Sequence, residues 1–189
     1  MVDLIQSIRA TFPRELREKP NWVTWQFEQR DGKATKVPYG CDDDKAKSTD
    51  ASTWSVFDQA ASSYTMYSRS GVGYVFDGDG VIGVDLDHCR EDGQFKPWAQ
   101  EIIARLHSYT EVSPSGTGVH IYLRGRLPGE RHKKAMPEGG AIEFYSDKRF
   151  FTVTGDYLDS TPRAIHERQD ALAALYAELF PSATPRPFA

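Results

Sequence analysis

The sequence predicts an α+β fold with a mostly antiparallel or mixed β-sheet. Short segments rich in β-branched and aromatic residues alternate with turn-forming residues along much of the chain. A few longer segments carry apolar residues at helical spacing instead. The 189 residues are 39% hydrophobic and 12% aromatic, which is enough to build one sizeable core, with room for a small appendage.

Turn and cap residues define the elements of the first half of the chain. Pro13 ends a helical pattern, Asp31-Gly32 is typical of a hairpin turn, and Pro38 favours a sheet edge. Thr53 is expected to be the N-cap of a helix. The turn over residues 77–80 is expected to join two strands as a second hairpin. In chain order we expect a helix over 3–12, strands over 22–27 and 35–39, a helix over 54–67, and strands over 71–76 and 81–87.

The second half continues the pattern after Pro97, which is expected to open a helix. We expect a helix over 97–106, strands over 109–112, 119–124, 141–145 and 149–154, and a helix over 163–180. Residues 1–160 are expected to form the main domain. Residues 161–189 are expected to form a C-terminal helix and a proline-rich tail from Pro181, which is typical of a linker.

Charge and cysteine content exclude several classes of protein. The net charge of −4 argues against a protein that binds nucleic acid through overall charge alone, although a local basic patch remains compatible with it. Cys41 and Cys89 belong to no CxxC pair, so no zinc site is expected. Two unpaired thiols, no signal peptide and no apolar run of transmembrane length favour a cytoplasmic protein with no membrane partner.

Two aspartates end the most hydrophobic of the expected strands. Asp85 and Asp87 follow the apolar run over residues 81–84. Because residues two apart in a strand point to the same face, both carboxylates project together, about 6.5–7 Å apart. Gly83 lies on that face and is expected to leave it open. Carboxylate oxygens at this spacing suit Mg²⁺ or Mn²⁺.

The strand over 119–124 places His120 on a polar face, with three aliphatic residues on the other face. If the aliphatic face packs inward, His120 lines a cleft. The preceding loop carries hydroxyl groups and glycine amides that can form an anion-binding nest: Ser113, Ser115, Gly116 and Gly118. The loop and histidine form either a phosphate site or an ordinary polar connector, and the residues alone leave both interpretations open.

Glu143 is the lone acid in the expected strand over 141–145, and burying it is unfavourable unless it has a partner. A metal ion shared with Asp85 and Asp87 would be such a partner. An ion pair with Arg149 or Arg124 is the alternative. The Arg149 guanidinium can also bind a phosphate bidentately. Three acids, a histidine and these cations together suit a nucleoside triphosphate held with two divalent ions.

Three segments resemble, in this order, the active-site motifs of the archaeo-eukaryotic primase superfamily: residues 81–87, 113–120 and 141–145. More narrowly, the chain resembles the bifunctional primase-polymerase (prim-pol) domain of phage and plasmid replication proteins. Residues 21–25, 36–39, 53–57 and 149–155 also resemble that family. The resemblance covers roughly residues 15–160, and the order and spacing of the motifs make it more specific than any motif alone.

The resemblance implies an RRM-like catalytic sheet beside a smaller α/β unit, and a metal-dependent DNA primase and polymerase. It assigns Asp85, Asp87 and Glu143 to catalytic Mg²⁺ or Mn²⁺ and His120 to the phosphates of the incoming nucleotide. The family often has serine where this chain has Gly118. The zinc-binding insertion of some relatives is missing. The implied partners are a single-stranded DNA template and primer, dNTPs or NTPs, and a helical priming region and helicase that follow in the full-length protein.

Two segments are candidates for contacts with the DNA strand. The hairpin over 22–39 carries Trp22, Trp25 and Tyr39 beside Lys36, which suits base stacking and phosphate binding, although such aromatics more often form a core. A basic loop suits backbone phosphates, or is simply solvated: it contains Arg131, Lys133 and Lys134.

Two other functions compete with the polymerase interpretation. The first is a catalytically inactive module that binds nucleotide or DNA, which the presence of all three acids and the histidine argues against. The second is a rolling-circle endonuclease, which requires a His-x-His metal pair and a nucleophilic tyrosine. No His-x-His occurs among the five histidines, so we rank this function last.

Overall fold

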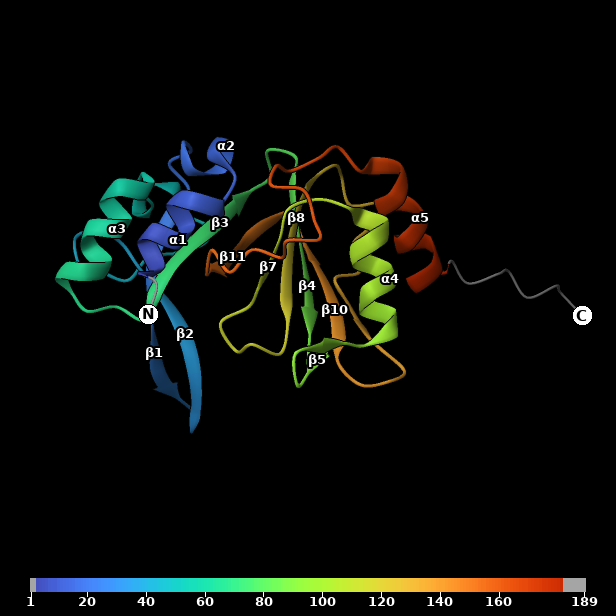
Figure 1. Cartoon of the computed structure of the whole chain (residues 1–189). Coiled ribbons are helices and arrows are strands. Elements are labelled where there is room, and N and C mark those ends of the chain that lie inside the picture. The colour runs from blue at the N-terminus through green and yellow to red at the C-terminus, as the bar shows by residue number, and fades with distance from the viewer. Residues whose placement is uncertain (1–2, 182–189) are drawn as a thin grey trace, which may run out of the picture.

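The computed structural model, which describes residues 3–181, contains two main antiparallel sheets that lie side by side (Figure 1). The strands of the first sheet are β1 (Trp22–Arg30), β2 (Lys33–Tyr39), β3 (Gly71–Asp77) and β11 (Asp147–Val153). The strands of the second sheet are β4 (Val81–Asp87), β7 (Thr110–Val112), β8 (Val119–Arg124), β9 (Lys133–Ala135) and β10 (Ala141–Tyr145). The strand orders are β11-β3-β1-β2 and β7-β8-β4-β10-β9. The predicted α+β class is confirmed.

Helices cover each sheet separately. Those near the first sheet are α1 (Leu4–Thr11), α2 (Arg14–Arg17) and α3 (Phe57–Met66), and those on the second are α4 (Pro97–Leu106) and α5 (Gln169–Leu179) (Figure 1). A small hairpin of β5 (Arg90–Glu91) and β6 (Gln94–Phe95) precedes α4. No helix in residues 3–181 combines the length and the apolar character needed to cross a membrane.

The first hairpin follows the prediction from the sequence. Asp31 and Gly32 both have positive φ angles, 50° and 74°, as a two-residue hairpin turn between β1 and β2 requires. β2 is an edge strand, as Pro38 indicates. The following helix begins later than predicted, because Thr53 ends a short 3₁₀ turn (Ala51–Thr53) that Asp50 caps through Ser52 N. The N-cap of α3 is therefore Val56.

The predicted hairpin of the strands on either side of residues 77–80 is wrong. β3 pairs with β1 on one side and β11 on the other, so it has no free edge for β4. The chain instead crosses from the first sheet to the second at Gly78 and Gly80, whose φ angles are 83° and 94°. It crosses back at Ser146, whose carbonyl accepts a hydrogen bond from Gly78 N at 3.0 Å. The two crossings hold the sheets together at one corner.

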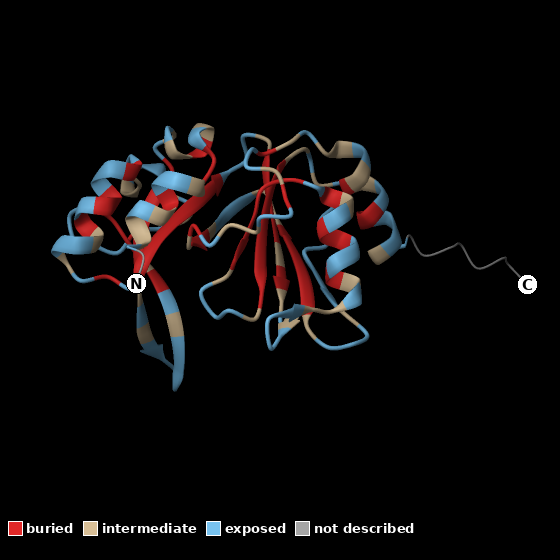
Figure 2. Cartoon of the chain, in the orientation of Figure 1, coloured by how far each residue is buried: buried red, intermediate tan, exposed pale blue. Residues whose placement is uncertain are grey.

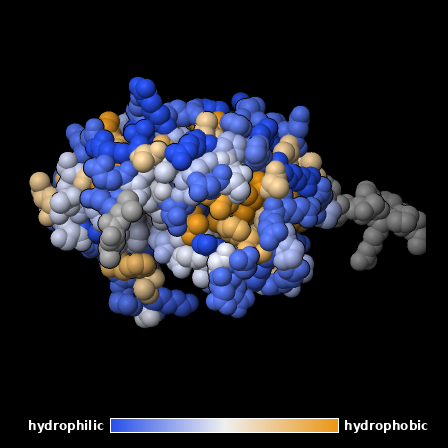
Figure 3. Space-filling model, viewed as in Figure 1, coloured by the Kyte–Doolittle hydropathy of each residue, from blue (hydrophilic) through white to orange (hydrophobic). Residues whose placement is uncertain are grey.

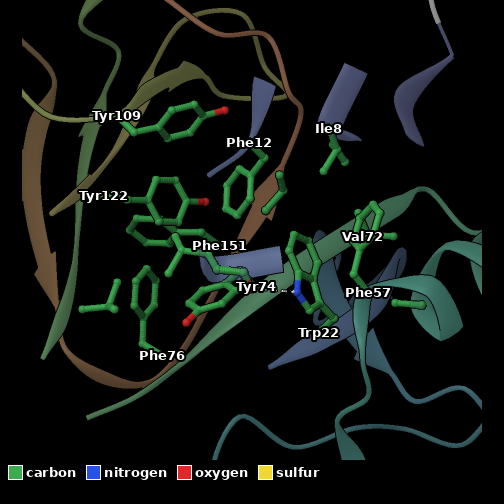
Figure 4. Close-up of a cluster of buried hydrophobic side chains, with 14 of the residues drawn as sticks. Ile8, Phe12, Trp22, Phe57, Val72, Tyr74, Phe76, Tyr109, Tyr122 and Phe151 are labelled. Carbon is green, nitrogen blue, oxygen red and sulfur yellow. Dashed lines mark hydrogen bonds between the residues drawn. The ribbon is translucent and has the colours of Figure 1, made fainter. Parts of the chain in front are cut away.

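An aromatic core fills the space between the two sheets (Figure 4). Trp22 and Tyr74 come from the first sheet and Tyr122 from the second. Phe12, at the end of α1, packs edge-on against Trp22 and Tyr122 and at a tilt against Tyr74. Tyr122, two residues after His120 on β8, is fully buried. The polar face of the second sheet is therefore open only at the end that carries His120 and Asp85.

The prediction that Gly83 leaves its face of the sheet open is wrong, because aromatic rings fill the space above it. A Cβ atom at this position would lie 2.4 Å from Phe76 Cζ and 2.6 Å from Phe151 Cε2, both closer than real contacts allow. Glycine is needed here so that the ring of Phe76, stacked on Tyr122, can lie directly on β4.

We expect Gly83→Ala to destabilise the protein by about 1–3 kcal/mol, because overpacking forces rings and backbone apart. Urea denaturation of the variant measures this loss. Phe76→Leu removes part of the obstruction, so Gly83→Ala is expected to destabilise the Phe76→Leu background less than the wild type. Equal stability of Gly83→Ala and wild type would contradict the close packing.

The opposite face of the second sheet packs on α4 and α5, as the alternation in residues 81–87 and 119–124 predicts (Figure 2). Ile82, Val84 and Leu86 are all 1% exposed or less, which confirms the face assigned to the two aspartates. α5 starts at Gln169, six residues later than predicted, and Leu172 lies in this core. The predicted proline-rich tail lies outside the described residues beyond Pro181.

Candidate active site

The pairing register of the second sheet brings five polar side chains into one row. Asp85 on the central strand β4 lies opposite His120 of β8 on one side and opposite Glu143 of β10 on the other. His120 in turn lies opposite Glu111 of β7, and Glu143 opposite Lys133 of β9. Residues paired in adjacent strands share a face, so this acid row, Glu111-His120-Asp85-Glu143-Lys133, crosses the whole sheet. Four of the predicted site residues, His120, Asp85, Glu143 and Lys133, are therefore consecutive in this row.

The negative charge of Asp85, at the centre of the acid row, has few partners that offset it. Its side chain is 17% exposed, and Oδ1 is buried with no hydrogen-bond partner among the described residues. Burial raises the pKa of Asp85, the charges of Asp87 and Glu143 raise it further, and those of His120 and Lys36 oppose the shift. A divalent cation would satisfy the unpaired oxygen and the repulsion at once, so the residues present fit the predicted metal ion.

His120 lies between two carboxylates. Its Nε2 is 3.9 Å from Asp85 Oδ1, and its Nδ1 is 3.9 Å from Glu111 Oε1. The imidazole stacks on the Phe151 ring of the first sheet, with a centroid separation of 4.6 Å and an angle of 24°. The side chain is only 6% exposed, so the ring is held in a narrow slot rather than facing open solvent.

Glu143 has partners of its own. Its carboxylate accepts hydrogen bonds from Lys133 Nζ and from the Tyr145 hydroxyl. Burial acts to raise the pKa of Glu143, but these two hydrogen bonds and the Lys133 charge outweigh it and lower the pKa. As the side chains stand, no group of three or more His, Cys, Asp or Glu within residues 3–181 is arranged to hold a metal ion. Lys133 and Tyr145 already bond the Glu143 carboxylate, so a metal ion shared with Asp85 would compete with them.

A cavity of about 410 Å³ opens beside the acid row at the junction of the two sheets. Asp85 and His120 form its floor, and Lys36 and Arg149 line it from β2 and β11. Lys36 thus lies near the acids instead of on a separate DNA surface. Desolvation by the surrounding protein lowers the pKa of Lys36, against the attraction of Asp85 and Asp87. The guanidinium of Arg149 lies 4.9 Å from the centre of the Tyr145 ring.

The loop before β8 is a compact turn closed by its own hydrogen bonds. Ser113 N donates to Gly118 O at 2.9 Å, and Ser115 Oγ lies within 3.1 Å of the hydroxyl oxygens of both Ser113 and Thr117. Gly116 has a φ of 74°. A Cβ on Gly118 would lie 2.7 Å from Leu86 O, so the backbone of β4 excludes the serine that the resembling family often has there.

The three basic residues of the predicted mobile loop separate in the structure. Lys133 and Lys134 lie on β9, a strand that the sequence did not predict. Lys133 pairs with Glu143 in the acid row, whereas Lys134 lies opposite Ile142 and thus points to the other face. Arg131 lies 5.9 Å from the Phe180 ring, beyond the end of α5. The sheet does not bring these three cations together.

The aromatic residues of the first hairpin belong mainly to the core. Trp22 is fully buried, and Trp25 and Tyr39 are 4% and 9% exposed, so the core alternative describes all three. The exposed aromatic residue of this hairpin is Phe27 on β1, which lines the cavity beside the acid row. In the sequence, Phe27 is an apolar residue in the polar half of β1, and this is the signal that could have identified it.

Glu111 is the member of the acid row that the sequence analysis did not identify. The residue is 0% exposed. Its carboxylate accepts hydrogen bonds from Gly155 N at 2.9 Å, Thr154 N at 3.3 Å and the Tyr109 hydroxyl at 3.2 Å, and approaches the Tyr122 hydroxyl at 3.5 Å. A lone acid within the predicted strand 109–112 was the available signal, similar to the one that identified Glu143.

We expect Glu111→Ala to destabilise the fold by about 3 kcal/mol or more, because two buried backbone amides and buried tyrosine hydroxyls lose their acceptor. Thermal and urea denaturation measure the effect. Glu130→Ala is the matched control, since Glu130 is exposed and is expected to change stability by less than about 0.5 kcal/mol. If both variants unfold at the same denaturant concentration, the hydrogen bonds to Glu111 do not stabilise the fold.

The chain is similar in sequence to a phage replication protein. It is 35% identical over 164 residues to the DNA primase-polymerase of Nitratiruptor phage NrS-1, an alignment that covers 84% of this chain and 22% of the phage protein. The chain thus spans about a fifth of the length of the relative it matches. No family model matches the chain.

Proposed function

We propose that this chain is the catalytic domain of a template-directed DNA primase and polymerase of the archaeo-eukaryotic primase type, acting in phage or plasmid DNA replication. The observation that carries the proposal is the register of the second sheet, which sets Asp85 directly between His120 and Glu143. Similarity to a phage primase-polymerase over most of the chain supports it. The second sheet then corresponds to the RRM-like catalytic sheet, and the first sheet with α3 to the smaller α/β unit.

In this proposal Asp85, Asp87 and Glu143 hold Mg²⁺ or Mn²⁺. Bound divalent ions supply the positive charge that aligns a 3′-hydroxyl with an α-phosphate for nucleotidyl transfer. The unpaired Oδ1 of Asp85 and the raised pKa of Asp85 support a cation at this place. Lys133 already provides a positively charged partner for Glu143. A metal ion at Glu143 therefore competes with the Lys133 ammonium group.

The triphosphate of the incoming nucleotide is proposed to lie in the cavity beside the acid row. His120 and Arg149 line that cavity and carry the donors that phosphate oxygens require. Ser113, Ser115, Gly116 and Gly118 provide further hydroxyl and amide groups in the loop just before His120. Because His120 is locked against Phe151, it needs no rearrangement to meet developing charge.

The single-stranded template and primer are proposed to contact cationic side chains of this chain. Lys36 is the best placed of them, since it lines the cavity. Lys133 in the acid row, and Lys134 and Arg131 outside it, are further candidates for backbone phosphates. The phage relative is several times longer than this chain, which leaves room for a priming region and a helicase in a full-length protein.

A nucleotide incorporation assay tests the proposed function. Primed and unprimed single-stranded templates are incubated with Mg²⁺ or Mn²⁺, with dNTPs and NTPs supplied separately. We expect extension of the primed template that depends on the metal and stops in EDTA. Triphosphate binding without incorporation under any of these conditions would favour the inactive binding module instead.

A further inference from the structure

Phe27 is an exposed aromatic residue with no structural partner on its outer side. It is 56% exposed, and the other large hydrophobic residues that are exposed within residues 3–181 are Val56 and Met66, on or next to α3. Single exposed apolar residues are common on proteins. Phe27 differs from the other two because it lines two neighbouring cavities at once.

The ring of Phe27 is held in position by its own sheet. It stands edge-on against the buried indole of Trp25, at 90° and with a centroid separation of 5.2 Å. Lys36, its register partner on β2, extends over the same indole, with Nζ 5.4 Å from the ring centre. The contact with Trp25 orients the Phe27 ring, and its 56% exposure leaves much of the ring surface available for stacking.

The second cavity has a volume of about 490 Å³ and lies beside the one at the acid row. Its walls are mainly apolar and include Trp25, Phe27, Leu4 and Val153. Ser70, Ser115 and Thr154 also line it, so polar residues lie among the apolar walls. Figure 3 shows a small apolar area on the β1–β2 hairpin, and a larger apolar patch near the middle of the same view.

A flat aromatic ligand with a negatively charged backbone matches these walls. Lys36 lines both cavities, so a cation lies at their boundary, where a phosphate would link a group in one cavity to a group in the other. The base of an incoming nucleotide must keep its pairing edge free for the template. A base held between apolar walls is therefore an unpaired base of the strand.

We propose that the cavity between Phe27 and Val153 binds an unpaired base of single-stranded DNA, stacked on the Phe27 ring, with the adjoining phosphate at Lys36. This inference rests on the proposed function, since it names the group that holds the DNA strand at the same site. Stacking on an aromatic face does not discriminate between bases, so the cavity accepts any sequence.

Fluorescence anisotropy with a labelled oligonucleotide tests the proposal in EDTA and without triphosphate, so that binding is separated from incorporation. We expect Phe27→Ala to weaken binding about tenfold or more, and Phe27→Trp to retain it. Met66→Ala, which removes another exposed apolar side chain, is the matched control and is expected to bind like wild type. Phe27→Ala should leave the salt dependence of binding unchanged, whereas Lys36→Ala should lower its slope by about one unit.

Oligonucleotides that carry an abasic position identify the ligand. The wild type should bind a strand with abasic positions throughout less tightly than an intact strand. Phe27→Ala should bind the two strands equally tightly. Equal affinity of wild type and Phe27→Ala for intact strands would overturn the inference, as would no measurable binding by wild type at low salt. A loss confined to dNTP affinity would assign the cavity to the incoming nucleotide and likewise overturn it. Failure of the incorporation assay alone would contradict the proposed function and leave this binding result standing.

Discussion

Replacing Asp85 and Asp87 together by asparagine is expected to lower nucleotide incorporation by at least about a thousandfold. The loss corresponds to several kcal/mol of transition-state stabilisation by a bound cation, which neutral amides do not hold. Steady-state extension of a primed template with Mn²⁺ measures it. Asp159→Asn is the control, since Asp159 is an exposed aspartate outside the acid row, and this variant should retain full activity.

The stability of Asp85→Asn separates this effect from misfolding. Because the folded protein raises the pKa of Asp85, its ionised form opposes folding at neutral pH, and this penalty disappears as the pH falls through the folded-state pKa. We expect Asp85→Asn to be more stable than wild type in EDTA at neutral pH. The difference should shrink on mild acidification. A destabilised variant would contradict the description of Asp85 as an uncompensated buried charge.

Replacing His120 by alanine is expected to lower kcat/KM for the triphosphate by about 100- to 1,000-fold. A preorganised donor in a site of low solvent exposure contributes this much to stabilising developing charge. Steady-state kinetics with varied dNTP measure the change, and circular dichroism confirms that the variant is folded. His120 lies on Phe151 and between two carboxylates, so the variant loses an imidazole that these contacts hold in place.

His166→Ala provides the matched control for His120. His166 lies on the segment before α5, away from the acid row, and its ring Nδ1 is 3.3 Å from Arg168 Nη2. The control variant should keep its kcat and KM. If His120→Ala retained wild-type kinetics as well, the histidine would have no part in binding phosphate.

The elements that carry the acid row follow from local periodicity. In residues 81–87 and 119–124, apolar and polar residues alternate, so the inward and outward faces of β4 and β8 can be assigned without a structure. Asp85 and His120 are placed correctly on this basis. Glu143 is identified because an acid in an apolar strand requires a partner.

Residues 77–80 show what periodicity does not reveal. Two strands joined by a short glycine-containing turn normally pair, but here β1 and β11 occupy both edges of β3, and neither contact is encoded near the turn. The same long-range packing brings Phe76 and Phe151 onto Gly83 and hides the face that the glycine was expected to open. Pairing between distant strands decides both features.

Glu111 and Phe27 are the parts of the candidate site that sequence analysis missed. The role of Glu111 depends on backbone amides at residues 154 and 155, more than forty positions away. Phe27 was overlooked because the neighbouring tryptophans are larger and more often bind bases, yet these lie in the core. Only the burial of each side chain in the structure shows which aromatic residues are available to ligands and which hold the sheets together.

The central claim is that Asp85, Asp87 and Glu143 bind the divalent cation that nucleotidyl transfer requires. The most direct test is a calorimetric titration of Mn²⁺ into the wild-type protein and into the Asp85→Asn/Asp87→Asn variant, each with a dNTP present. We predict saturable binding to the wild type and its loss in the variant. Equal Mn²⁺ binding by the two proteins would contradict the claim.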